Sequence, residues 1–184
     1  MKILIINLPR TGSTSFHTKL VKETGGISIF NPYDGTNRTS ILKKENIVVK
    51  SGILYPQDLT DEQRIDFYIN LISDFDTTYL LSRRNTKEHI ESWAYMVKHN
   101  TKENWEKSQR FGIDDHFTSL SNYVFDDSTI TEEDYKKAKL DLENWNNILN
   151  LLSNKTSIPI TYYEDIFDAN GKDRYRKIKT QKLI

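Results

Sequence analysis

The segment Lys2–Leu20 constrains the fold more than any other, because it joins an apolar run to a breaker loop and a helical pattern. Ile3–Ile6 is an unbroken apolar run, which is typical of a parallel strand buried on both faces. Pro9 and Gly12 then interrupt the strand, and the apolar residues within 16–21 recur at helical spacing. The segment therefore predicts a strand, a tight loop and a helix.

The predicted loop carries one arginine, Arg10, and a cluster of hydroxyl side chains, Thr11, Ser13, Thr14 and Ser15. Backbone N–H groups at a helix N-terminus lack helical partners, and the helix dipole adds positive potential, so such a loop favours an anion. The alternative is an ordinary turn in which a Ser or Thr side chain caps the helix. The loop is therefore a candidate anion site.

The loop departs from the P-loop of nucleotide-hydrolysing enzymes. That motif places a lysine and then a Ser or Thr directly after its second glycine. Here Ser13 follows Gly12, and the basic residue, Arg10, precedes the glycine. A nucleotide-dependent kinase is therefore the second choice among functions for this loop.

Composition narrows the class of protein. Lys+Arg and Asp+Glu are both 26, so the formal net charge is zero, which argues against a general nucleic-acid binder. There is no cysteine, so disulfides and thiolate metal sites are excluded, and no metal-ligand cluster is visible. The sequence shows no signal-peptide layout and no apolar run of bilayer length, so a cytoplasmic protein without a membrane span is expected.

Apolar runs alternate with amphipathic segments along the chain. Helix caps are predicted at Asn85, with Glu88 three residues later, and at Thr131. Strands are predicted at 27–30, 47–50, 77–81 and 158–162, and helices at 61–75, 85–100 and 131–152. A loop is predicted at 31–35, an irregular polar stretch with one or two short helices at 101–128, and a basic tail from about 171. This alternation predicts an α/β fold, a three-layer sandwich around a central parallel sheet, in a single domain over residues 1–184.

Three charged or polar spots follow predicted strands: Pro9–Ser15, Lys50 and Arg83–Arg84. The carboxyl ends of parallel strands share one edge of the sheet, which is where such folds bind ligands. Arg84 also has a serine, Ser92, eight residues on in the next predicted helix. An arginine fork and a hydroxyl suit a phosphate group, whereas a sheet-edge arginine and a packed helix serine would be structural.

The loop Pro-Arg-Thr-Gly-Ser-Thr-Ser (9–15) and the pair Arg84 and Ser92 resemble motifs of the sulfotransferases that use 3′-phosphoadenosine 5′-phosphosulfate (PAPS). Lys50–Pro56 and Tyr163–Ile166 resemble two further segments of that family, in the same order. The resemblance runs from Ile3 to about Ile166 and is closest to the small bacterial or phage-like branch.

The resemblance implies a role for each part of the site. The amides of Thr11, Gly12, Ser13, Thr14 and Ser15 would hold the 5′-phosphosulfate. Arg84 and Ser92 would bind the 3′-phosphate. Arg10 would neutralise the leaving oxygen and Lys50 the sulfuryl oxygens, and no metal is required. The product would be 3′-phosphoadenosine 5′-phosphate (PAP).

The general base is where the sequence departs from the family. Gly52 stands where some relatives have a histidine, and Asn31 where others have a glutamate. Asp34 is the nearest carboxylate, and His17 and His89 are the fallback candidates. The closing Arg-Lys-Gly motif of many relatives is also missing, and the basic tail is either its substitute or a solvated end.

Three functions stay open. They are sulfuryl transfer to a hydroxyl or an amine of a small-molecule or carbohydrate acceptor, a P-loop kinase, and a non-catalytic protein that binds PAP or another nucleotide and has lost its base. An acceptor could stack on aromatic side chains or these could be core; the candidates are Tyr33, Tyr55, Trp93, Tyr95, Trp105 and Phe111. The sequence does not identify the acceptor or the oligomeric state.

Overall fold

The computed structural model describes residues 1–30, 38–54, 58–99 and 130–167. The chain divides into two compact units, Met1–Arg84 with Asn144–Ile184, and Asn85–Glu143. The loop predicted at 31–35, the one or two short helices predicted within 101–128 and the basic tail from about 171 lie outside the described residues.

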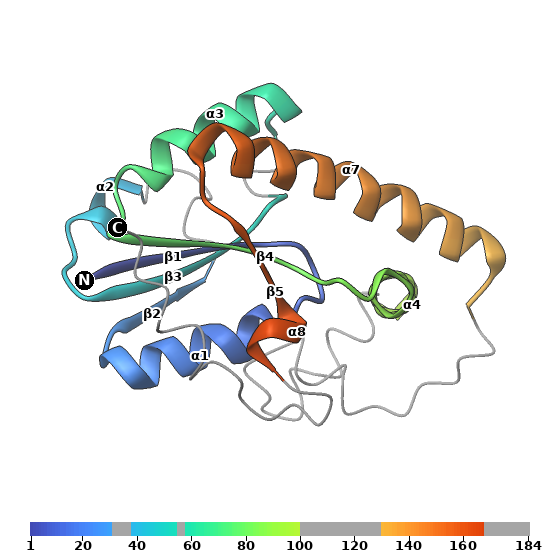
Figure 1. Ribbon diagram of the computed structural model, residues 1–184, viewed down its shortest axis with the longest axis horizontal. Helices are drawn as coiled ribbons and strands as arrows, with labels where there is room; N and C mark the ends of the chain where they lie inside the picture. Colours follow the sequence, from blue (N-terminus) through green and yellow to red (C-terminus); the bar gives the residue numbers. More distant parts are fainter. Residues whose placement is uncertain (31–37, 55–57, 100–129, 168–184) are drawn as a thin grey trace. The chain divides into compact units, whose positions relative to one another are not determined.

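A parallel sheet forms the centre of the first unit (Figure 1). In the described part of the chain it has five strands in the order β2-β3-β1-β4-β5, and every pairing is parallel, as predicted. The last strand begins at Ile160 rather than at Ile158, since Pro159 has no N–H to offer a ladder. The strands are β1 (Lys2–Asn7), β2 (Ile27–Phe30), β3 (Ile47–Gly52), β4 (Thr77–Ser82) and β5 (Ile160–Tyr162).

The helices predicted after β1 and at 61–75, 85–100 and 131–152 are present, and two short helices in the described ranges, α2 and α8, were not predicted. Both predicted caps form. The Glu88 amide donates to Asn85 Oδ1 at 3.2 Å, and the Asp134 amide donates to Thr131 Oγ1 at 3.2 Å. The described helices are α1 (Ser13–Thr24), α2 (Arg38–Leu42), α3 (Asp61–Ile72), α4 (Thr86–His99), α7 (Glu132–Thr156) and α8 (Tyr163–Ile166).

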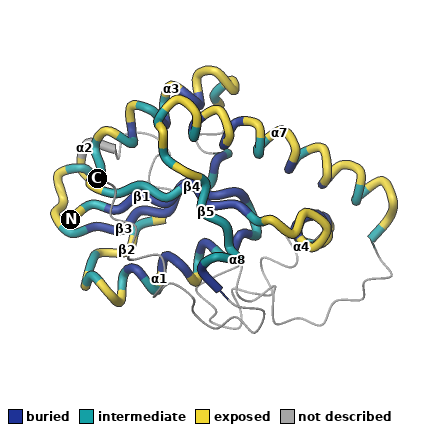
Figure 2. Tube along the Cα trace, in the orientation of Figure 1, coloured by how far each residue is buried: buried dark blue, intermediate teal, exposed yellow. Residues whose placement is uncertain are grey.

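Alternating side chains of β1 bury both faces of the sheet. Leu4 and Ile6 belong to a core with residues of α3 and α7, and Ile3 and Ile5 belong to a second core with residues of α1 and α8. Figure 1 shows these helix pairs on opposite faces, and Figure 2 shows β1 as buried. The predicted three-layer α/β sandwich is therefore confirmed. Within the described ranges, no helix has the length and apolar character needed to cross a bilayer.

The strand order places the predicted loop at a topological switch point. The chain leaves β1 toward β2 on one side, and it reaches β4 on the other side of β1 only after β3. Parallel crossovers are right-handed, so α1 and α3 cover opposite faces of the sheet. The segments after β1 and β4 therefore diverge at the carboxyl edge, where such folds bind ligands.

Two leucines of α7 test the packing of the core against the sheet. Leu149 is fully buried, whereas Leu151, in the same helix, is 46% exposed. Leu149→Ala should lower the free energy of unfolding by about 2–5 kcal/mol, because it leaves a cavity under the sheet. Leu151→Ala, which changes helix propensity equally, should cost less than about 1 kcal/mol. Denaturant unfolding measures both, and equal losses would contradict this packing.

Candidate functional site

The β1–α1 loop turns through two residues with left-handed backbone. Arg10 has φ 59° and Gly12 has φ 68°. Gly12 is the N-cap of α1, and no side chain caps this helix. The first helical bond runs from the Phe16 amide to the Gly12 carbonyl at 3.1 Å. The Ser and Thr side chains of the loop therefore do not cap the helix. The first backbone amides of α1 have no carbonyl partner within the helix.

Buried hydrogen bonds hold the loop in this shape. The Leu8 carbonyl accepts from Thr11 Oγ1 at 2.8 Å and from Asn7 Nδ2 at 2.8 Å. The Leu8 amide donates to the Leu81 carbonyl of β4 at 3.2 Å. Thr11 is fully buried. Its hydroxyl therefore shapes the loop, and its backbone amide is the group that can serve a ligand.

Lys50 reaches the start of α1 from the neighbouring strand β3. Its Nζ donates to Thr14 Oγ1 at 2.8 Å and lies 4.6 Å from the centre of the Phe30 ring. The side chain is almost fully buried. The structure thus brings together two residues predicted for one site, Lys50 and Thr14. A buried ammonium already held by a hydroxyl and an aromatic face is preorganised for an anion.

Arg10 lies near a second arginine, Arg83, which follows β4. Burial is the main cause that lowers the pKa of the Arg10 guanidinium, and the charge of Arg83 lowers it further. Burying one cation beside another costs free energy unless an anion compensates. The loop therefore gathers positive charge, with Arg10 in the loop itself, Lys50 bonded to Thr14, and Arg83 near Arg10.

Tyr163 of α8 packs directly on the glycine of the loop. A Cβ placed on Gly12 would lie 2.5 Å from Cδ2 and Cε2 of the Tyr163 ring. The same ring carries the guanidinium of Arg83 at 5.0 Å from its centre. Two features therefore require glycine at position 12: the positive φ of its backbone and the aromatic ring packed against its Cα.

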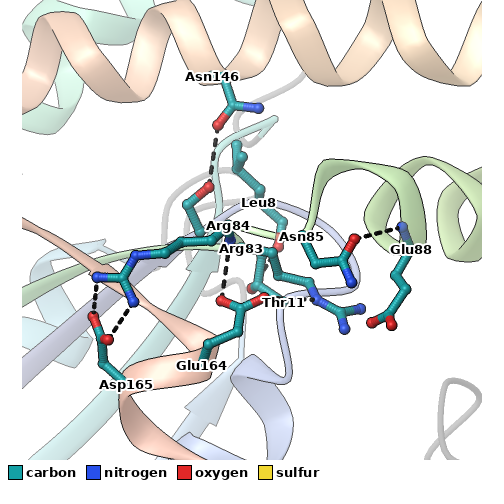
Figure 3. A network of polar contacts seen from close by, with 10 residues as sticks. Leu8, Thr11, Arg83, Arg84, Asn85, Glu88, Asn146, Glu164 and Asp165 are labelled. Atoms are coloured by element: carbon teal, nitrogen blue, oxygen red, sulfur yellow. Dashed lines mark hydrogen bonds and ion pairs between the residues drawn. The ribbon is translucent and has the colours of Figure 1, made fainter.

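Arg84 makes a different set of contacts, and Figure 3 shows those with Asp165 and Glu164. Its guanidinium binds both carboxylate oxygens of Asp165, Nη2 at 2.8 Å from Oδ2. Its backbone amide donates to Glu164 Oε2 at 3.0 Å, and its guanidinium lies over the Tyr162 ring at 4.4 Å. The predicted 3′-phosphate arginine is thus held by a carboxylate in a bidentate fork, the geometry that a phosphate also accepts.

His17, the fallback base, points into the structure. It is 1% exposed, and its Nε2 lies 2.9 Å from the Val48 carbonyl, which only accepts, so Nε2 carries the proton. Its ring packs against Phe30 at 4.4 Å between centroids. Among the described residues, Nδ1 has no hydrogen-bond partner. This placement serves the contact between α1 and β3, and a catalytic role for His17 stays a prediction.

The other predicted residues are placed as follows. Ser13 is buried and Ser15 is exposed in the first turn of α1. Asp34, the preferred base, lies outside the described residues. Ser92 and the fallback base His89 lie on α4, in the second unit, so their relation to Arg84 and the loop stays a prediction.

Sequence reasoning gave no specific role to Arg83 or to the carboxylates of α8. Glu164 Oε1 lies 3.9 Å from Arg83 Nε, and the same carboxylate accepts from the Arg84 amide. The sequence signal that could have identified Arg83 was the strand pattern, because alternate residues of a strand face opposite sides of a sheet. Applied past the end of β4, that alternation puts Arg83 on the side of Leu81, whose core includes Phe16 of α1.

Comparisons of the chain with protein-family models, curated proteins and solved structures found no match.

Gly12 can be tested against Gly25, because both have a left-handed backbone, with φ 68° and 64°, and only Gly12 has a neighbour within 4 Å of the added Cβ. Gly25→Ala should cost about 1–2 kcal/mol of unfolding free energy for the backbone alone. Gly12→Ala should cost about 1–3 kcal/mol more, because the methyl group overpacks against Tyr163. Denaturant unfolding of the two variants decides, and equal costs would show that the Tyr163 contact is absent in solution.

The buried His17 should make stability depend on pH. Burial lowers its pKa, the Val48 hydrogen bond raises it, and the charge of Lys50 lowers it, with a net lowering. The unfolded chain then binds the proton first, so stability is complete above about pH 6.5 and is lost as the pH falls through the lowered pKa. His17→Gln keeps an N–H for Val48 and cannot titrate, so its unfolding free energy should fall less between pH 7 and 5. Parallel curves for the two proteins would refute this.

Proposed function

We propose that this protein is a PAPS-dependent sulfotransferase and that the β1–α1 loop binds the 5′-phosphosulfate. The observation that carries the proposal is the collection of cations at this loop. Lys50 Nζ is bonded to Thr14 Oγ1 at 2.8 Å, and Arg10 is half-buried near Arg83. A group with several negative charges fits such a site, because it offsets the cost of burying these cations.

The order of residues in the loop favours this reading over a kinase. Arg10 precedes the glycine and Ser13 follows it, so the lysine that a P-loop directs to the β- and γ-phosphates is missing. The strand-loop-helix at the switch point is common to both classes. The choice therefore rests on the resemblance of the four segments to sulfotransferases.

In the proposed reaction, the hydroxyl oxygen of the acceptor attacks sulfur in line with the bond to the bridging oxygen. The new S–O bond forms as the old one breaks, PAP leaves with the electron pair, and the hydroxyl proton passes to a base. Lys50 and the first amides of α1 would stabilise the sulfuryl oxygens, and Arg10 the departing oxygen. Such a transfer depends on positioning and electrostatics, as phosphoryl transfer does.

Arg84 is the proposed ligand of the 3′-phosphate, with Ser92. In this structure both carboxylate oxygens of Asp165 accept hydrogen bonds from the Arg84 guanidinium. A phosphate can present the same pair of oxygens, so in this proposal it replaces the carboxylate on Arg84. Asp34 is the proposed general base, and the acceptor is a small molecule or carbohydrate with a hydroxyl group.

A non-catalytic PAP-binding protein is the second candidate, and it is favoured by two positions where a base was sought, Gly52 and His17. Gly52 ends β3 without a side chain. His17 gives its Nε2 proton to Val48 and is 1% exposed. Neither position offers an accessible base. This candidate keeps the nucleotide site and lacks turnover.

Thermal unfolding with PAP, compared with ADP and Mg²⁺, tests the proposal. PAP at about 100 times its dissociation constant should add roughly 2.7 kcal/mol to stability, and ADP with Mg²⁺ should add less. Arg10→Ala should lower PAP release from PAPS by about 10²–10³-fold, since one preorganised donor to the leaving oxygen is lost.

Each outcome separates the candidates. Stabilisation by PAP without any PAP release from PAPS, tried with water and with simple alcohols and sugars as acceptors, identifies the non-catalytic binder. Greater stabilisation by ADP with Mg²⁺ identifies the kinase. If neither ligand stabilises the protein, the loop is only a turn and the proposal is wrong.

A further inference from the structure

The neighbouring arginines Arg83 and Arg84 leave the sheet in different directions. Leu81 pairs in register with Asn7 of β1 and belongs to the core that contains Phe16 of α1. Side chains alternate along an extended chain, so Arg83 continues the side of Leu81, and Figure 3 shows the Arg84 side chain pointing away from that of Arg83. The side chain of Arg83 is 16% exposed, and that of Arg84 is 55% exposed.

Contacts of Arg83 bring it to the β1–α1 loop. Its guanidinium stacks on the Tyr163 ring at 5.0 Å, and this ring is the one that packs on Gly12. The hydrogen bond from the Leu8 amide to the Leu81 carbonyl fixes the end of β4 beside the loop. One aromatic ring thus contacts both the helix N-cap and Arg83.

Glu164 and Tyr163 together position the Arg83 side chain. Glu164 Oε1 lies 3.9 Å from Nε of Arg83, and its other oxygen accepts from the Arg84 amide at 3.0 Å. A guanidinium stacked on a ring and paired at one edge loses little further freedom when it binds an anion. Its charge also acts on Arg10, whose pKa it helps to lower.

We propose that Arg83 is a second binding arginine of the 5′-phosphosulfate site, whereas Arg84 serves only the 3′-phosphate. This inference rests on the proposed function and adds a residue to it. The contacts divide the two arginines in this way, because Arg83 shares Tyr163 with the loop and Arg84 is held by Asp165.

Two ligands separate the roles of the arginines, because AMP has only the 5′-phosphate and PAP has both. Isothermal titration should show that Arg83→Ala weakens AMP and PAP by the same factor, about 10- to 100-fold, as expected for a charge-assisted hydrogen bond. Arg84→Ala, the matched control next to it in sequence, should weaken PAP similarly and change AMP less than about two-fold. Arg83→Lys keeps the charge but loses the fork and the stacking. Its affinity for AMP should therefore lie between the affinities of the unchanged protein and of Arg83→Ala.

Circular dichroism and the unfolding midpoint without ligand show whether each variant is folded. If Arg83→Ala does not fold, Arg83→Gln replaces it, since glutamine keeps a polar contact to Glu164. The inference is overturned if a folded Arg83 variant binds AMP as the unchanged protein does, or if it weakens PAP alone. In both cases the unchanged protein still binds PAP, so the proposed function stands. If the unchanged protein binds neither nucleotide, the proposed function falls and this inference with it.

Discussion

The burial of β1 on both faces is the constraint on which the rest of the structure depends. Ile3 and Ile5 face α1 and α8, while Leu4 and Ile6 face α3 and α7, so the strand can only lie in the middle of the sheet. A central first strand, with its next neighbours reached on opposite sides, creates the switch point at its carboxyl end. The loop that follows therefore emerges between the ends of β3 and β4, which carry Lys50 and Arg83.

The site combines features that are each unfavourable for folding. Arg10 and Gly12 both have a left-handed backbone, and Arg10 is half-buried near another cation, Arg83. Tyr163 against Gly12, Thr11 on the Leu8 carbonyl and Lys50 on Thr14 hold this arrangement in place. Strain and buried like charge persist only where the surrounding packing over-determines them, and they cluster at binding and catalytic sites. The hydrophobic layers on either side of β1 provide that packing here.

The fold was largely predictable from local sequence, because apolar runs, helical spacing and the caps Asn85 and Thr131 each act within a few residues. The site was predictable only in part. Lys50 and the loop follow from the strand ends, but the choice between Arg83 and Arg84 depends on which residues of α8 each guanidinium contacts. The partner of His17, the Val48 carbonyl, and the ring of Tyr163 on Gly12 come from distant segments. The four-residue α8 has no sequence periodicity long enough to detect.

The two arginines after β4 also bear on what kind of ligand suits this edge of the sheet. A single small anion needs one cationic centre, which Arg10 and Lys50 already supply at the loop. Arg84 points away from Arg83 and is held by a different residue of α8, Asp165, whose carboxylate binds the guanidinium in a bidentate geometry. In the proposed function, a ligand with an anionic group at each end would engage the loop and Arg84 together, whereas a monophosphate would engage the loop alone.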